Sequence, residues 1–99
     1  MLKIKAELTL NLLLRHPIRS GYRPILFFLP NNGTSGAIHL LDREKLFPGE
    51  TAVVDIFPMT KSLVDDPTVG RIVKIGESPA TIIGEIRIIE VSTIEAPRK

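Results

Sequence analysis

The residues best suited to chemistry lie in one short stretch, RHPIRSGYR, at positions 15–23. It holds Arg15, His16, Arg19, Tyr22 and Arg23, and no acidic residue occurs between positions 8 and 41. Arginine forks bind phosphate oxygens in pairs, and a tyrosine ring can stack on a base or a ribose. A solvated loop in front of a strand would have the same composition. The residues alone therefore leave two interpretations open, a phosphate-binding loop and a merely soluble one.

The sequence carries none of the common signatures of an enzyme or a metal site. It contains neither GxxxxGK[ST] nor GxGxxG, so we expect no bound nucleotide. With no cysteine, and with His16 and His39 as its only histidines, it offers a poor ligand set for zinc. Asp65 and Asp66 are adjacent in a turn-like segment, where capping is expected rather than acid–base work. Ser20 lies near His16, but no nearby acid orients that ring. We expect a non-catalytic protein without cofactor or metal.

Length and composition indicate one globular domain spanning residues 1–99. Hydrophobic residues make up 43% of the chain and charged residues 24%, both near the globular average. No apolar run is long enough for a membrane helix, and the start of the sequence does not read as a targeting signal. We therefore expect a cytoplasmic protein with no membrane partner. The net charge of +2 is small, so any role in RNA binding depends on where the positive charge gathers.

The pattern of apolar residues predicts about six strands and no helix. Even-numbered residues from 2 to 12 are apolar and the odd-numbered ones polar, which is typical of a half-buried strand. The same pattern at 82–88 predicts a second strand that faces a shared core. That strand, the last, spans 81–91, and the others are predicted at 24–29, 37–41, 51–57 and 70–76. Turn-rich or polar connections are predicted at 30–36, 41–50, 58–68 and 77–80, and a frayed tail at 92–99.

Two details accompany this pattern. Pro48-Gly49 suits the centre of a type II turn, and His39 is expected on the outer face of its strand. Six short antiparallel strands in a chain of this length favour a small barrel or sandwich.

Four stretches, in this order along the chain, resemble one known family. They are RHPIRSGYRPILFF, NGTSGAI, FPGETAVVDIFPM and IGESPATIIGEIRII. They are similar to RHTPFxxGYRPQFYF, DVTGTI, MPGDxxxxxxxLxxPI and IREGGRTVGAGVV in the C-terminal (third) domain of translation elongation factor Tu. The similarity runs from about Lys3 to Val91, and its GYRP and PG elements are the most specific.

The resemblance implies an all-β fold, a six-stranded antiparallel barrel of Greek-key type. In that family the domain helps to hold the T-stem of aminoacyl-tRNA through its backbone and also contacts the nucleotide-exchange factor. Thr34 or Ser35 stands at the family's turn threonine, and Glu77 at its loop glutamate. The sequence also departs from the family. Ile25 stands where the family has a glutamine near the tRNA, and the REGGR loop reads GESPA without its arginines. We also expect no GTPase domain.

We therefore expect a translation-associated binding module that contacts tRNA or another RNA. The alternative is a protein–protein or regulatory module that docks on a translation factor or self-associates. The candidate RNA- or phosphate-binding residues are Arg15, His16, Arg19, Tyr22, Arg23, Thr34, Ser35 and Glu77.

Overall fold

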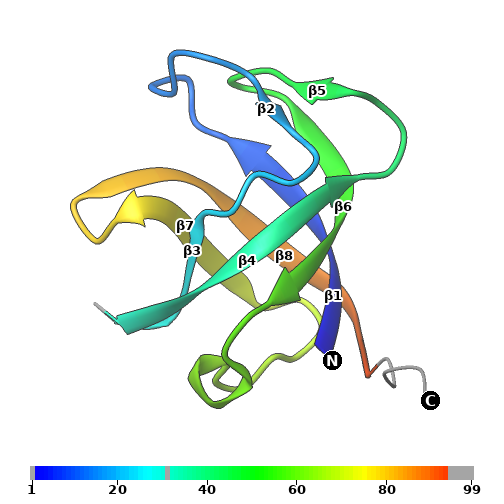
Figure 1. The fold of residues 1–99 in the computed structure, drawn as a ribbon, viewed down its shortest axis with the longest axis vertical. Helices are drawn as coiled ribbons and strands as arrows, with labels where there is room; N and C mark the ends of the chain where they lie inside the picture. Colours follow the sequence, from blue (N-terminus) through cyan, green and yellow to red (C-terminus); the bar gives the residue numbers. More distant parts are fainter. Residues whose placement is uncertain (1, 31, 94–99) are drawn as a thin grey trace.

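Alternating apolar residues build the wall of a closed, six-stranded antiparallel β-barrel, seen in a computed structural model that describes residues 2–30 and 32–93 (Figure 1). The barrel strands are β1 (Leu2–Leu10), β3 (Ile25–Leu29), β4 (Asn32–Leu40), β6 (Thr51–Pro58), β7 (Ile72–Ser78) and β8 (Thr81–Thr93). Around the barrel they follow the order β1-β6-β4-β3-β7-β8. Because β3, β4 and β6 are successive neighbours and β1 lies beside β6, the topology contains a Greek key. The expected fold class is confirmed.

The inward residues of β1 and β8 form the shared core that the alternation predicted. Every even-numbered residue of β1 is buried, and so are Gly84, Ile86 and Ile88 of β8. Each fully buried leucine or isoleucine contributes roughly 1.5–3 kcal/mol. The prediction was wrong at Leu12, which is 83% exposed, and at Ile82, which is only half-buried while its neighbour Ile83 is buried. β1 ends at Leu10, and the chain turns away from the barrel at that point.

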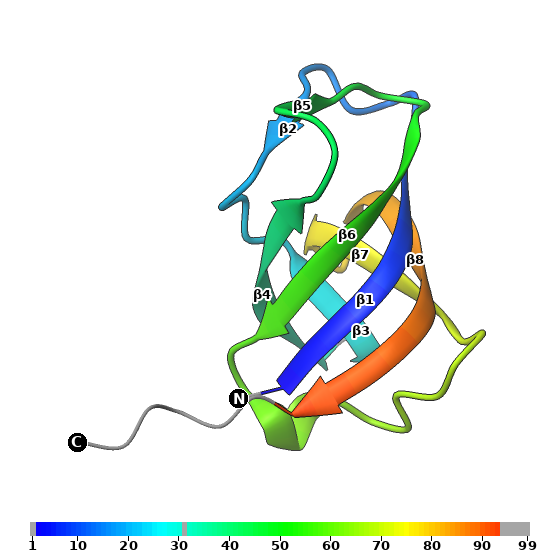
Figure 2. The same ribbon diagram turned by 90° about the vertical axis from the view of Figure 1, so that its right-hand side faces the viewer.

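The joint between β1 and β8 shows why glycine occupies position 84. Gly84 is paired with Leu10, and a Cβ added to it would lie less than 3.0 Å from the Thr9 carbonyl oxygen. Farther along, the register shifts between Lys5 and Ala6. Such a bulge bends a strand, and Figure 2 shows the long β8 curving around the barrel.

Three predicted boundaries were wrong. The strand expected at 70–76 lies two residues farther along, as β7 (Ile72–Ser78). The NNGTSG segment was expected as a turn, but β4 begins at Asn32, so most of it is strand. Its turn-forming residues still fit a strand because Thr34 points inward and finds a hydrogen-bond partner there. The expected tail is also shorter, because β8 continues to Thr93, which pairs with Leu2. The rest of that tail lies outside the described residues.

The two ends of the barrel are closed differently. Two short strands that the sequence did not reveal, β2 (Ile18–Arg19) and β5 (Lys45–Leu46), form a ribbon over one end (Figures 1 and 2). The start of β1, the end of β8 and a single 3-10 turn, η1 (Lys61–Leu63), lie at the other end. Arg71 ties the polar connection after η1 to the barrel. Its guanidinium donates to the Asp66 carbonyl of that connection at 3.0 Å and to the Phe28 carbonyl of β3 at 2.6 Å.

Candidate nucleic-acid interface

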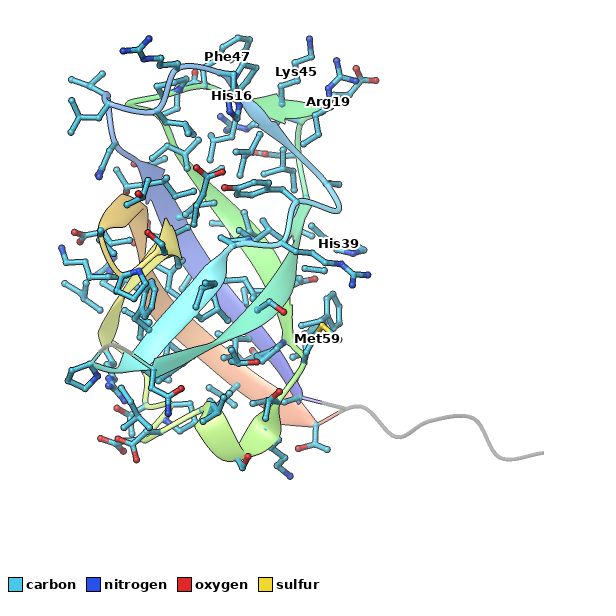
Figure 3. The ribbon with its side chains drawn as sticks, turned by 60° about the vertical axis from the view of Figure 1, so that its left-hand side comes forward. His16, Arg19, His39, Lys45, Phe47 and Met59 are labelled. Atoms are coloured by element: carbon cyan, nitrogen blue, oxygen red, sulfur yellow. The ribbon has the colours of Figure 1, made fainter. Side chains whose placement is uncertain are left out.

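The β2–β5 ribbon brings together two cations that are far apart in the sequence. Ile18 pairs with Leu46, and both side chains are buried, at 2% and 0% exposure. The next pair in the register is Arg19 with Lys45. Since successive residues of a strand point to opposite faces, anchoring the first pair in the core directs the second pair outward. Figure 3 shows Arg19 and Lys45 together at this end of the molecule.

Neither of these two cations is ion-paired with any of the described residues. Because Arg19 and Lys45 lie opposite each other, they make the local electrostatic potential positive. Like charges in this arrangement also destabilise a β-ribbon. Asp42, on the connection before β5, is engaged by Arg43, which donates to it at 2.8 Å. That hydrogen bond lowers the pKa of the Asp42 carboxyl. An anion that bound between Arg19 and Lys45 would relieve their repulsion.

A turn beside the ribbon presents an exposed aromatic ring. Gly49 has a φ of +87°, and the Glu50 amide donates to the Phe47 carbonyl at 3.0 Å, as expected of the type II turn predicted at Pro48-Gly49. The Glu50 carboxylate accepts a hydrogen bond from the Phe47 amide at 2.9 Å, which fixes the turn and also occupies that carboxylate. Phe47 is 50% exposed and lies near Lys45 in Figure 3. Neither Lys45 nor Phe47 was predicted from the sequence.

A cleft of about 380 Å³ lies between the loop after β1 and the β7–β8 hairpin. It brings Arg15 and His16 together with Glu77, three residues that the sequence analysis had selected. Nδ1 of His16 lies 3.2 Å from the Pro17 carbonyl oxygen. Because its walls carry both signs of charge, the inside of the cleft suits a polar uncharged group, such as a ribose, better than a phosphate. Arg15 is exposed, so its guanidinium can also face a phosphate outside the cleft.

Tyr22 does not offer the free stacking surface that the sequence suggested. Its ring is half-buried against the core, and its hydroxyl is buried without a hydrogen-bond partner among the described residues. Burial, together with the negative charge of Glu77, raises the pKa of the Tyr22 hydroxyl. Its backbone is tied to β4 because the Ile38 amide donates to the Tyr22 carbonyl at 2.9 Å. The exposed aromatic ring at this end of the barrel is Phe47 instead.

Thr34 and Ser35 take part in the structure of the barrel wall. Thr34 is 2% exposed, and its hydroxyl accepts from the Thr60 amide at 2.8 Å while donating to the Ser35 carbonyl at 3.1 Å. The same Ser35 carbonyl accepts from the Met59 amide at 2.9 Å. These bonds fasten the segment after β6 to β4, so the Thr34 hydroxyl serves the fold and does not face a ligand.

The three arginines of the opening stretch do not form one patch. Arg15 lines the cleft, Arg19 lies on the ribbon, and Arg23 lines a separate groove with Met59 and Lys61. Of the three, Arg15 and Arg19 lie at the ribbon end of the barrel, where Lys45 also lies.

No known protein family identifies the function of this chain, so the positions of the side chains described above are the main guide to it. A scan against protein-family models finds no match, and a search of curated proteins finds no significant relative. None of the helical segments in the described ranges has the length and apolar character needed to span a membrane. Within residues 2–30 and 32–93, no three histidine, aspartate or glutamate side chains gather into a possible metal site.

Proposed function

We propose that the chain is a non-catalytic, translation-associated module that binds the backbone of RNA at the ribbon end of the barrel. One observation carries the proposal: the ribbon register sets Arg19 against Lys45 on the outer face without an ion-pair partner among the described residues. A phosphate between them would receive charge-assisted hydrogen bonds from both. The association with translation, and hence with the cytoplasm, rests on the resemblance to the third domain of elongation factor Tu.

The neighbouring groups supply the other contacts that an RNA strand needs. Arg15 can reach a second phosphate, and the exposed ring of Phe47 can stack on an unpaired base. In the cleft, the Glu77 carboxylate can accept a hydrogen bond from a ribose 2′-hydroxyl, the group that distinguishes RNA from DNA. Contacts of this kind position a protein along a nucleic acid without reading its sequence. We therefore infer weak binding with little sequence preference and no chemical step.

The proposal is tested by fluorescence anisotropy with labelled transfer RNA and with a labelled poly-uridine oligonucleotide. Replacing Arg19 and Lys45 together by glutamine removes two charge-assisted contacts. At roughly 1 kcal/mol each, this loss weakens binding about thirtyfold. The matched control replaces Arg23 and Lys61 by glutamine, which removes the same charge away from the ribbon.

We expect the control pair to retain most of the affinity. Equal weakening by both pairs would reduce the interaction to net charge, and an undiminished affinity in the ribbon variant would remove the ribbon from the interface. Either result, or no binding by the parent protein at low salt, would contradict the proposal.

A further inference from the structure

The side of the barrel carries a second hollow, which the proposed RNA interface does not use. We call it the side groove. Its volume is about 560 Å³, within the range of pockets that hold a bound group. Its lining residues are Leu2, Arg23, Ala37, Phe57, Pro58, Met59 and Lys61. Figure 3 shows Met59 well away from the ribbon, and none of the lining residues is shared with the cleft beside Arg15.

The floor of the side groove is apolar and held in place by the strands. Ala37 of β4 is paired with Phe57 of β6, and its small side chain leaves space beside the larger ring. His39 packs edge-on against Phe57, with ring centroids 5.2 Å apart and an interplanar angle of 70°. This contact restrains the aromatic ring that a bound side chain would meet.

One wall of the groove combines a fixed backbone with an adaptable side chain. The Met59 amide donates to the Ser35 carbonyl at 2.9 Å, and the Thr60 amide donates to the Thr34 hydroxyl at 2.8 Å. These bonds hold the wall in place before any partner arrives, which lowers the entropic cost of binding. The Met59 side chain is 67% exposed, and a methionine at such a place fits partners of varied shape.

The charges along the groove have one sign. Arg23 and Lys61 are exposed, and neither is ion-paired with a described residue. No acidic residue lines the groove. Asp55, on the same face of β6, is paired with Lys3 at 3.9 Å. An apolar floor with unpaired cations at its rim is complementary to an apolar group flanked by carboxylates.

We propose that the side groove docks an acidic peptide segment of a partner protein, with a large apolar side chain between the Phe57 floor and the Met59 wall and carboxylates against Arg23 and Lys61. The barrel formed by the described residues is closed, so it offers no free edge for strand addition. The β2–β5 ribbon does have edges, but it lies over one end of the barrel and away from the side groove (Figure 2). At the side groove itself, a partner would therefore be recognised through its side chains. RNA would use the cations but leave the apolar floor without a function.

The test uses the full chain and a labelled peptide with a central Leu-Phe pair flanked on each side by aspartates and glutamates. We expect saturable binding, with backbone amide shifts in NMR spectra at Ala37, Phe57 and Met59. A peptide with Gly-Gly at its centre should bind about tenfold more weakly, because it cannot fill the floor. The Met59→Gln variant, altered at an exposed site and therefore expected to fold, should bind the Leu-Phe peptide about threefold or more weakly.

Two double variants separate the groove from general electrostatics. Arg23→Glu with Lys61→Glu should weaken peptide binding about thirtyfold or more. Arg19→Glu with Lys45→Glu changes the net charge equally, and at physiological salt it should alter binding only about twofold. Circular dichroism verifies that each variant is folded.

Several results would overturn the proposal. They are an absence of saturable binding, equal affinity for the Leu-Phe and Gly-Gly peptides, equal loss in the two double variants, and amide shifts confined to the ribbon. A concentration-dependent dimer that the Arg23→Glu and Lys61→Glu changes abolish would assign the groove to a second copy of the chain. Protection of the groove amides by RNA would assign it to nucleic acid. Because the RNA proposal rests on Arg19 and Lys45, each proposal can fail without the other.

Discussion

Replacing Leu46 by alanine tests whether the ribbon depends on its anchor in the core. Leu46 is 0% exposed and pairs with Ile18 in a two-residue strand. Removing a buried leucine side chain costs roughly 2–5 kcal/mol, out of roughly 5–15 kcal/mol for a whole domain. We expect the variant to stay folded, with a Tm lower by about 10–25 °C. Leu41→Ala, at a side chain that is 50% exposed, should cost less than about 0.5 kcal/mol.

The same change should weaken RNA binding although it removes no charge. Without the Leu46 side chain, β5 loses its anchor in the core and only Ile18 of β2 remains buried, so the register that sets Arg19 against Lys45 is held less firmly. The two cations then no longer present a fixed pair to a phosphate. Urea unfolding followed by circular dichroism gives the free energy of unfolding, and anisotropy well below the unfolding midpoint gives the affinity. A variant as stable as the Leu41→Ala control would refute the anchoring argument. A destabilised variant with unchanged affinity would show that the ribbon geometry is not the binding site.

Three further predictions concern the barrel itself. Gly84→Val should cost roughly 3 kcal/mol or more in thermal unfolding, because its side chain would collide with the Thr9 carbonyl; parental stability would show that the strands can separate there. Arg71→Lys should cost roughly 1 kcal/mol, because lysine lacks the planar fork that donates to several carbonyls; an unchanged denaturation midpoint would contradict this. Tyr22, the single tyrosine, should ionise above the ordinary value of 10.0 in an absorbance titration. As the pH rises, the unfolded chain loses the Tyr22 hydroxyl proton before the folded chain does, so the free energy of unfolding should fall above pH 10.0. Glu77→Gln should lower the Tyr22 pKa of the folded protein. A Tyr22 pKa at or below 10.0 would contradict the burial of the hydroxyl.

The fold could be predicted where each strand has one buried and one exposed face. The alternation through Leu2–Leu10 and at Ile86 and Ile88 marks such strands, because side chains on a barrel wall face the core at every second position. Strand prediction failed where the conformational preference of the residues differs from the conformation that the rest of the barrel imposes. Asparagine, glycine and serine favour turns, yet the segment from Asn32 forms strand because its neighbours in the barrel supply the hydrogen bonds.

The candidate site was harder to predict because its parts are distant in the sequence. The cluster of arginines at positions 15–23 suggested one patch. Arg23, however, lies just before β3, where the chain rejoins the barrel wall, and it lines the side groove. Lys45 belongs to a two-residue strand, too short to give a periodic signal. Only the pairing of Ile18 with Leu46 places Lys45 against Arg19, and no local pattern encodes that contact.

The salt dependence of RNA affinity measures how many phosphates the ribbon end of the barrel contacts. Each phosphate contact releases condensed counterions, which contributes about −0.7 to the slope of log affinity against log salt for a single strand. If Arg15, Arg19 and Lys45 each contact a phosphate, the parent protein should give a slope of about −2 on the poly-uridine oligonucleotide. The Arg19→Gln and Lys45→Gln variant should give about −0.7, from Arg15 alone. A parent slope near zero, or the same slope in parent and variant, would show that Arg19 and Lys45 bind no phosphate.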